Sequence, residues 1–201
     1  MATNIAVLAS GNGSNAQNIF ELVKNNASLN IACVVTDNPE AGVIKRSKDF
    51  GIPVYLVAKD KKESKQKHEE RILKQLDKLS IKWVLLAGYM RILTKNFINH
   101  YFDEKLNEAR IVNIHPSLLP AHKGLRAYEK AYSNKDKDVG VTLHFIESEV
   151  DSGKIIFQKR FYPDYSQNIE KFKEKGFEKE FECYRLFLNL FNSNGEFLWN
   201  K

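Results

Sequence analysis

The amino-acid sequence predicts an α/β fold, a doubly wound and mostly parallel sheet with an antiparallel extension. Two observations lead to this fold class. Short β-rich apolar runs alternate with amphipathic stretches up to His115, with short connections between them, and this alternation is typical of a doubly wound sheet. The runs are also apolar on consecutive residues, which indicates strands buried on both faces, as in a parallel sheet.

The expected elements follow in order along the chain. The runs expected as parallel strands are 5–9 (IAVLA), 31–36 (IACVVT), 53–58 (PVYLVA), 82–88 (KWVLLAG) and 111–115 (IVNIH). Amphipathic stretches predict helices at 15–24, 41–50, 69–79 and 94–102. Two later runs, 139–146 and 154–161, are expected to pair as antiparallel strands that extend the sheet. The segment 169–191 predicts one or two helices with an apolar stripe of Phe181, Tyr184, Leu188 and Phe191.

Composition narrows the class of protein. The 201 residues are 43% hydrophobic and 28% charged, which is ordinary for a globular chain and long enough for one domain, expected over 1–201. Cys33 and Cys183 lie far apart and form no CxxC motif, and two cysteines are too few for a disulfide scaffold. Their scarcity is typical of a reducing cytoplasm. No apolar run is long enough to cross a bilayer, and the N-terminus lacks the basic region of a signal peptide. We therefore expect a cytoplasmic protein without a membrane partner.

The net charge of +6 raises the question of an anionic partner. Much of the excess lies in the lysine-rich segment 59–67 (KDKKESKQK). Such blocks are usually solvated surface, although a patch that attracts a small anion remains an alternative. The sequence shows neither zinc-finger spacing nor an RNA-recognition motif, so nucleic acid is not expected as a partner. Binding of an anion or RNA without catalysis stays a minor hypothesis.

A glycine-rich segment, residues 10–18 (SGNGSNAQN), directly follows the first expected strand. Gly11 and Gly13 let the backbone turn sharply and approach a ligand closely. Ser14 and Asn15 can cap the following helix, whose free N–H groups favour an anion. The segment therefore predicts an anion-binding turn, with a purely structural strand-to-helix turn as the alternative.

The same segment has another functional interpretation. Gly11, Gly13 and Ala16 fit the relaxed GxGxxG/A fingerprint, and Asp37 ends the second strand about 20 residues later. A dinucleotide-dependent oxidoreductase is therefore kept as the alternative function. The GxxxxGK[ST] phosphate loop is absent, so ATP or GTP hydrolysis has no support.

The strand 111–115 carries two polar residues at the end where ligands bind in an open parallel sheet. Asn113 and His115 are two residues apart on an extended segment, so their side chains point to the same face. An amide that donates hydrogen bonds and an imidazole that moves protons can together stabilise an oxyanion and transfer a proton. A structural role for this histidine is the competing interpretation. Pro116 and Pro120 indicate a rigid loop after the strand.

The segment 147–153 (ESEVDSG) separates the two later β runs. Its acidic residues face solvent by default, but Asp151 precedes a Ser-Gly turn and can instead reach His115. Such a contact would fix the tautomer of the imidazole and raise its pKa. His122 has no metal-ligand spacing to other residues and is expected to be a loop residue.

In five segments, in the same order, the sequence resembles the phosphoribosylglycinamide formyltransferase family of purine synthesis. These are IAVLASGNGSNAQNI, VVTDNPEAGVIKRSKDFGIP, LLAGYMRIL, IVNIHPSLLPAHKG and GVTLHFIESEVDSGKII. The resemblance runs from about Asn4 to Gln158 and is weaker beyond. It implies a Rossmann-like N-terminal half without a dinucleotide. It also implies transfer of a formyl group from 10-formyltetrahydrofolate to the amine of glycinamide ribonucleotide.

The resemblance also implies roles for individual residues. The catalytic residues would be Asn113, His115 and Asp151. The substrate would be held by Gly13, Ser14, Asn15 and Glu180. The folate would be held by Lys65, Met90, Arg91, Ile92, Leu93, Asn113, Glu147, Ser148, Glu149, Val150 and Asp151.

The same resemblance implies a division of the chain and a set of partners. About 1–100 would form a phosphate-binding half and about 101–201 a catalytic and folate-binding half. The partners would be the two substrates, without a metal, and the oligomeric state stays open. His122 stands where phenylalanine is usual in the family, and Ser152 where glycine or threonine is frequent. These two departures concern fine specificity rather than the reaction.

Overall fold

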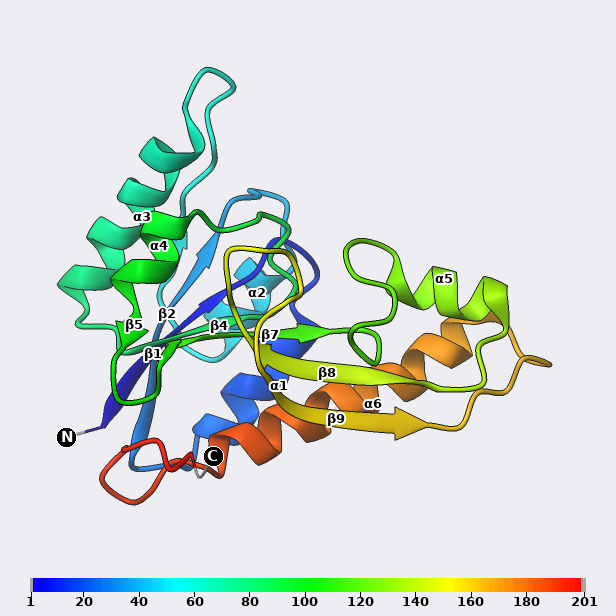
Figure 1. The fold of residues 1–201 in the computed structure, drawn as a ribbon. Helices are drawn as coiled ribbons and strands as arrows, with labels where there is room; N and C mark the ends of the chain where they lie inside the picture. The colour runs from blue at the N-terminus through cyan, green and yellow to red at the C-terminus, as the bar shows by residue number, and fades with distance from the viewer. Residues whose placement is uncertain (1, 200–201) are drawn as a thin grey trace.

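The computed structural model describes residues 2–199, and within them seven strands form one twisted sheet (Figure 1). The strands are β1 (Thr3–Leu8), β2 (Leu29–Thr36), β3 (Val54–Leu56), β4 (Trp83–Leu86), β7 (Ile111–His115), β8 (Val139–Phe145) and β9 (Ile155–Phe161). Their order across the sheet is β3-β2-β1-β4-β7-β8-β9. The first five pair in parallel, whereas β8 and β9 are antiparallel. The predicted fold class, with its antiparallel extension, is confirmed.

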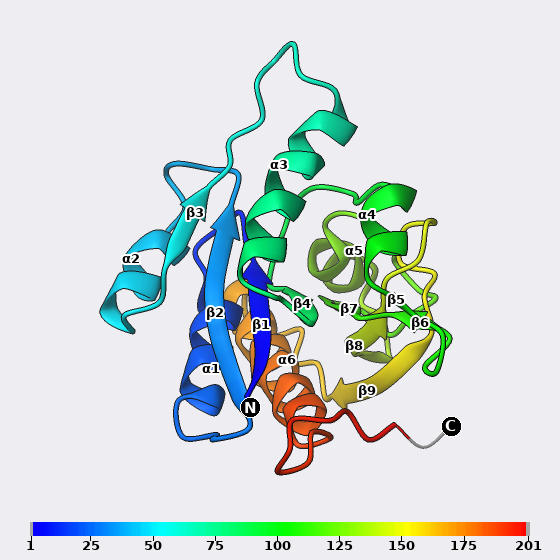
Figure 2. The ribbon, with the colours of Figure 1, turned by 90° about the vertical axis from the view of Figure 1, so that its left-hand side faces the viewer.

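Helices cover both faces of the sheet (Figure 2). They are α1 (Ser14–Val23), α2 (Val43–Asp49), α3 (Lys65–Lys78), α4 (Lys95–His100), α5 (Ala127–Asn134) and α6 (Ile169–Leu188). Ile19 of α1 and Phe187 of α6 pack in one apolar cluster, and Ile72 of α3 and Phe97 of α4 pack in a second. Because these helices bury apolar side chains against opposite faces of the sheet, the molecule is a three-layer α/β sandwich. None of the helices within residues 2–199 has an apolar stretch that could span a bilayer.

The structure adds elements that the pattern of the sequence did not predict. Helix α5 was not expected, because it is short and its buried positions are two alanines and a tyrosine rather than a clear apolar stripe. A small hairpin of β5 (Phe102–Asp103) and β6 (Glu108–Ala109) was also missed. Helix α3 begins earlier than expected, at Lys65, because the Ser64 hydroxyl caps it by accepting the Lys67 N–H.

The C-terminal segment forms one helix, α6, followed by a turn that ends in a bridge between Phe191 and Phe197. Of the stripe expected here, Tyr184, Leu188 and Phe191 are buried. Phe181 is only partly buried, and Phe187 takes its place in the core. The Tyr184 hydroxyl donates to the carbonyl of Leu86, which ties α6 to the carboxyl end of β4.

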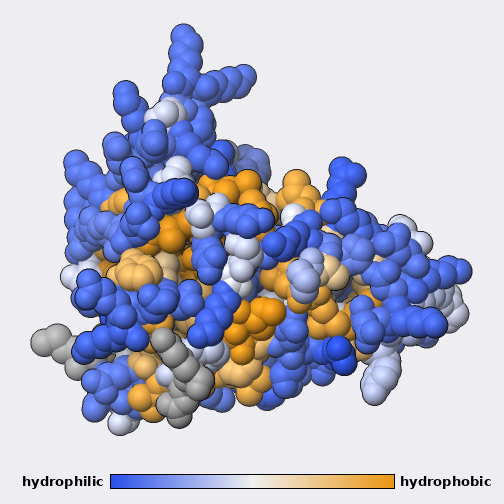
Figure 3. Space-filling model, in the orientation of Figure 1, coloured by the Kyte–Doolittle hydropathy of each residue, from blue (hydrophilic) through white to orange (hydrophobic). Residues whose placement is uncertain are grey.

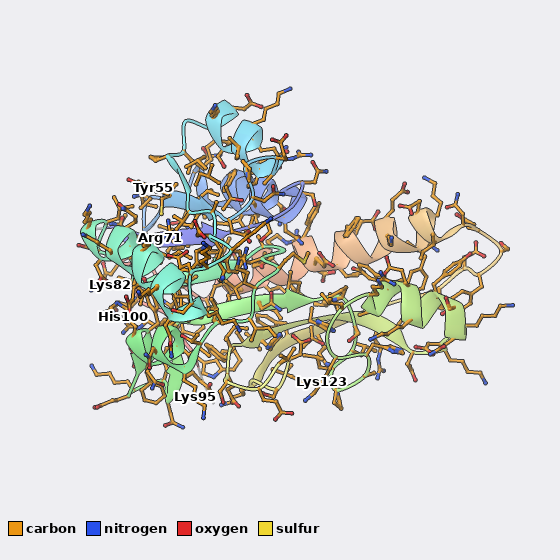
Figure 4. All side chains as sticks on the ribbon, turned by 90° about the horizontal axis from the view of Figure 1, so that it is seen from above. Tyr55, Arg71, Lys82, Lys95, His100 and Lys123 are labelled. Atoms are coloured by element: carbon orange, nitrogen blue, oxygen red, sulfur yellow. The ribbon has the colours of Figure 1, made fainter. Side chains whose placement is uncertain are left out.

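The order in which strands are added to the sheet reverses at β1. The chain first adds β2 and β3 on one side of β1, and then returns to add β4 on the other side. The helix after β1 covers one face and the helix before β4 covers the other, so a crevice opens at the carboxyl ends of these strands. Seen from above (Figure 4), Tyr55, Arg71 and His100 lie at one end of the molecule, and α5 lies at the other. The loops after β1, β4 and β7 meet between these two ends.

Candidate active site

A cavity of about 430 Å³ lies at the carboxyl ends of β1, β4 and β7. Its lining comes from 11–15, 86–93, 113–116, 124–126, 146–147 and 149–151, together with Tyr128, Phe177 and Glu180. Ligands bind at this place in open α/β sheets. The cavity therefore brings together segments that are far apart in the sequence.

Most of the residues expected in the site line this cavity. They are Gly13, Ser14, Asn15, Met90, Arg91, Ile92, Leu93, Asn113, His115, Glu147, Glu149, Val150, Asp151 and Glu180. Two expected residues do not line it. Lys65 is the exposed first residue of α3, and Ser148 is exposed in the loop between β8 and β9. The folate contacts of these two residues stay predictions.

The glycine-rich loop enters α1 through Gly13, which has a φ of 81°, in the left-handed region that glycine adopts without strain. A side chain there would also place its Cβ 2.7 Å from the Cβ of Val43. Gly13 is itself the N-cap residue, and no side chain caps the helix. The expected caps from Ser14 and Asn15 are therefore wrong, because Ser14 begins the helix and the Asn15 amide donates to Glu180 instead. The uncapped first turn leaves backbone N–H groups for an anion.

Asp37 holds the loop after β4 in place. One carboxylate oxygen accepts the Ser10 hydroxyl at 2.6 Å, and the other accepts Arg91 Nε at 2.6 Å. The Ser10 hydroxyl in turn accepts the backbone N–H of Met90. The acid that a dinucleotide site would need for a ribose is thus engaged within the protein. Nothing in the structure favours the oxidoreductase alternative.

Asp151 and His115 meet at the base of the cavity. The His115 Nδ1 lies 3.2 Å from the Asp151 Oδ2, and its Nε2 lies 2.9 Å from the carbonyl oxygen of His122. Asp151 Oδ2 also accepts the backbone N–H of Gly124 at 2.7 Å. An imidazole that faces an oxygen acceptor with each nitrogen is satisfied only when both nitrogens carry hydrogen. The geometry therefore favours an imidazolium paired with a carboxylate.

Asn113 is positioned by a residue that sequence reasoning missed. In the register of β7 against β8, Asn113 lies opposite His144. The His144 Nδ1 faces the carbonyl oxygen of Phe145 at 2.8 Å and donates to it, so its Nε2 can accept the Asn113 amide at 3.4 Å. Burial lowers the pKa of His144, which keeps the ring neutral and able to accept. Only the strand register could have revealed this contact.

Glu180 is buried in the wall of the cavity, although it comes from α6, late in the chain. Its Oε2 accepts the Asn15 amide at 2.5 Å, so the end of the chain contacts the glycine-rich loop. Burial raises the pKa of this carboxyl, and hydrogen bonds to it oppose the rise. Sequence reasoning missed further lining residues, among them Tyr89, Leu125, Arg126, Tyr128 and Phe177.

The rim of the cavity is apolar. Met90, Ile92, Leu125 and Val150 line it, with exposed fractions of 66%, 53%, 72% and 39%. Figure 3 shows apolar residues near the centre of this face, below the hydrophilic projection that precedes α3. Exposed apolar side chains around a polar floor are typical of a site for a small ligand that has both apolar and polar parts.

Comparisons with known proteins agree with this architecture. Residues 3–188 match the family model described as formyl transferase. The chain is 33% identical to phosphoribosylglycinamide formyltransferase of Haemophilus influenzae over 188 residues, which cover 93% of this chain and 86% of that protein. It is 35% identical to the enzyme of the same name from Bacillus subtilis, with 89% of each chain covered.

Solved structures give the same result. The crystal structure of phosphoribosylglycinamide formyltransferase from Bacillus halodurans superposes with a TM-score of 0.84 at 36% identity, covering 91% of this chain and 92% of that one. Glycinamide ribonucleotide transformylase 1 from Symbiobacterium toebii superposes with a TM-score of 0.87 at 28% identity, covering 94% and 87%. Family model, sequence relatives and solved structures thus agree that the chain belongs to the phosphoribosylglycinamide formyltransferase family.

Proposed function

We propose that this protein transfers the formyl group of 10-formyltetrahydrofolate to the amine of glycinamide ribonucleotide in purine biosynthesis. The observation that carries the proposal is the meeting of Asn113, His115 and Asp151 in one cavity with the glycine-rich loop. Membership of the family implies a folate-type formyl donor. The chain supplies the groups that this reaction needs: an anion site, a donor for an oxyanion and a charged acid–base pair.

The phosphate of the ribonucleotide is assigned to the first turn of α1. Its backbone N–H groups have no side-chain cap, and the helix dipole adds positive potential there. Gly13, Ser14 and Asn15 are the residues proposed to hold it. Glu180 is proposed to accept hydrogen bonds from the rest of this substrate. In this view 1–100 form the phosphate-binding half of a single domain, and 101–201 form the catalytic and folate-binding half.

The folate is assigned to the apolar rim. Met90, Arg91, Ile92 and Leu93 form one wall, and the loop Glu147, Ser148, Glu149, Val150 and Asp151 is proposed to surround the pterin. Backbone groups in an irregular loop offer donors and acceptors to the edge of a heterocycle. Lys65 is proposed to meet the glutamate carboxylates of the folate from the exposed start of α3.

Formyl transfer begins with attack of the amine nitrogen on the formyl carbon, which gives a tetrahedral intermediate with an oxyanion. The Asn113 NH2 group has two N–H donors, so it can donate one to the oxyanion while the other faces His144 Nε2. The positive charge of His115 stabilises the oxyanion electrostatically. Asp151 stabilises that charge and takes part in moving a proton from the amine nitrogen, through water, to N10 of the departing tetrahydrofolate. The carbon–N10 bond then breaks, and no step needs a metal ion or a covalent enzyme intermediate.

Features outside the cavity fit the same proposal. Within the lysine-rich segment 59–67, the Lys59 ammonium donates to the carbonyl oxygens of Asp60 and Glu63 and stabilises its own turn. Nucleic acid is not proposed as a partner, because the sequence has no nucleic-acid-binding motif. We also propose a cytoplasmic location, where buried thiols such as Cys33 and Cys183 stay reduced.

The test is formyl transfer assayed with both substrates in the presence of a chelator. Product formation supports the proposal, and absence of product with folded protein overturns it. A second measurement addresses the alternative: NAD(H) and the folate are titrated separately while the melting temperature is followed. A rise with the folate alone is expected, whereas a rise with NAD(H) alone would favour an oxidoreductase.

A further inference from the structure

Tyr128 of α5 reaches the wall of the cavity from a side that the proposed reaction does not use. Its side chain is buried, and its hydroxyl donates to the Glu180 Oε1 at 2.6 Å. The other carboxylate oxygen accepts the Asn15 amide at 2.5 Å. Three residues from α5, α6 and α1 thus form one hydrogen-bonded chain, and all three line the cavity.

The direction of this chain is fixed by the chemistry of its members. The Tyr128 hydroxyl donates to one oxygen of Glu180 and the Asn15 NH2 group donates to the other, and an ionised carboxylate accepts both bonds. The orientation of the Asn15 amide then follows, and its carbonyl oxygen points away from the carboxylate. That oxygen, Asn15 Oδ1, is buried and has no hydrogen-bond partner within residues 2–199. It is left as an acceptor for a donor that the protein does not supply.

The backbone of α6 makes room for the tyrosine. Gly176 lies in the interior of this helix, one turn before Glu180, where glycine costs about 1 kcal/mol relative to alanine. A Cβ at this position would lie 2.2 Å from the Tyr128 hydroxyl oxygen. The ring also packs edge-on against Phe172 and Phe177, with centroids 6.1 and 5.8 Å away. The hydroxyl is therefore held in one place by the helix that it contacts.

We propose that Tyr128 is a positioning residue for the amine substrate, acting through Glu180 and Asn15. It orients the carboxylate and, through it, the amide, so that their free acceptor sites face the amine and hydroxyl donors of glycinamide ribonucleotide. This inference rests on the proposed function. It adds a residue of α5, a helix that the sequence pattern did not reveal, to the recognition of that substrate.

The two donors also act on the ionisation of Glu180. Burial raises the pKa of the carboxyl, and the donors on Tyr128 and Asn15 oppose that rise. Loss of the tyrosine hydroxyl removes one of two donors that favour the ionised form. An ionised and oriented carboxylate accepts hydrogen bonds from an amine more strongly than a neutral one.

The test is Tyr128→Phe, which keeps the ring in the core and removes the hydroxyl. We expect the KM for glycinamide ribonucleotide to rise about 10-fold, as for loss of a hydrogen bond to a charged group. The kcat and the KM for 10-formyltetrahydrofolate should stay within about 2-fold of the wild type, because the Tyr128 hydroxyl bonds to Glu180 and not to Asn113, His115 or Asp151. The matched control is Tyr132→Phe, on the next turn of α5, whose hydroxyl donates to the Gln167 carbonyl outside the cavity. This control should leave both KM values unchanged.

A double-mutant cycle shows whether Tyr128 acts through Glu180. In a Glu180→Gln background, Tyr128→Phe should raise the KM for the ribonucleotide by less than about 2-fold. A full 10-fold further rise would overturn the proposal, as would an unchanged KM in the single variant. A parallel loss in kcat, in both KM values and in melting temperature would also overturn it, since it would indicate a merely structural role.

Calorimetric binding of glycinamide ribonucleotide alone separates this inference from the proposed function. A wild-type protein that binds the ribonucleotide but transfers no formyl group would overturn the proposed function, while the Kd of Tyr128→Phe would still decide the role of the tyrosine. About 10-fold weaker binding by the variant supports that role. Equal binding by the two proteins, or no binding by the wild type, overturns it.

Discussion

His115 Nδ1 lies 3.2 Å from Asp151 Oδ2, while the other nitrogen of the same ring lies 2.9 Å from the carbonyl oxygen of His122. The ring is therefore held between a charged and a neutral acceptor in a buried position. Asp151 makes this contact from a left-handed backbone conformation, with a φ of 51°. An L-residue there is strained by about 1 kcal/mol, which is a cost borne to place the carboxylate against the imidazole.

The first prediction concerns the charge of Asp151. Asparagine tolerates the left-handed region as well as aspartate does, and its side-chain oxygen can still accept the Gly124 N–H, so Asp151→Asn should fold normally. Without the charge, the imidazolium of His115 loses its partner. We expect kcat to fall about 100- to 1000-fold, as for loss of one preorganised electrostatic element. Steady-state kinetics with both substrates should show KM values near those of the wild type.

A control for this prediction is His115→Ala, alone and combined with Asp151→Asn. Both single variants should lose activity to a similar degree. The double variant should lose far less than the product of the two losses, because residues that act as one unit are non-additive. Near-normal turnover in Asp151→Asn would show that Asp151 acts only as a loop residue and takes no part in the reaction.

The second prediction separates two glycines of the loop after β1. A side chain at Gly13 meets both a positive φ and Val43, whereas a Cβ at Gly11 meets nothing within 4 Å. Gly13→Ala should therefore destabilise the fold by at least about 1–2 kcal/mol from the backbone conformation alone. In a chain of this size, where 1 kcal/mol shifts the melting temperature by about 2–4 °C, that lowers it by about 2–8 °C. Gly11→Ala is the matched control, and it should melt like the wild type.

Substrate binding in the same two variants tests the anion site. If the turn holds the phosphate, Gly13→Ala should weaken binding of the ribonucleotide far more than binding of the folate. Equal loss of both ligands would instead reflect a general loss of structure. A Gly13→Ala protein as stable as the wild type would contradict the predicted clash between a Cβ at residue 13 and the Val43 side chain.

The parallel strands and most helices could be predicted from the sequence, because the patterns that indicate them lie within short segments. Consecutive apolar residues mark a strand such as 111–115, and helical spacing marks Ile72 and Leu76. Helix α5 lacked such a signal. Its Tyr128 is buried only because α6 lies beside it and Gly176 leaves room for the ring. That packing joins residues far apart in the chain, and no local pattern contains it.

The site residues also include some that a local pattern predicts and others that only the folded structure identifies. Asn113 and His115 could be assigned to one face from spacing alone, and the structure has both in the cavity. Asp37 satisfied a dinucleotide pattern in the sequence, but in the structure it binds Ser10 and Arg91. His144 gave no signal, because its role depends on the antiparallel register that sets it opposite Asn113.

The third prediction concerns Lys65, which begins α3 and does not line the cavity. A long exposed ammonium can meet the glutamate carboxylates of the folate only at the surface, where each ion pair contributes about 0–1 kcal/mol. Lys65→Ala should therefore raise the KM for 10-formyltetrahydrofolate by no more than about 5-fold at low ionic strength. Because salt screens such pairs, the effect should fade as ionic strength increases. An effect that persists at high salt would indicate a more closely packed contact.

The last prediction concerns pH and His144. Burial lowers the pKa of this ring below its ordinary value of 6.5, so the folded protein binds its proton less readily than the unfolded chain does. Well above pH 6.5 both states are neutral at this site, and it contributes no pH dependence. As pH falls below that value, the unfolded chain takes up the proton first. The free energy of unfolding should therefore decrease by up to about 1.4 kcal/mol per pH unit from this group alone.

His144→Gln removes the titrating group near the carboxyl end of β8, where the ring also accepts the Asn113 amide. Urea unfolding at about pH 7.5 and about pH 5.5 gives the slope of stability against pH for each protein. The variant will be less stable than the wild type at the higher pH, because a packed buried side chain has been replaced. Its loss of stability on acidification should nevertheless be smaller, since one proton fewer is taken up on unfolding. Equal slopes for the two proteins would show that His144 titrates alike in both states, and its neutral, accepting role towards Asn113 would then lose its physical basis.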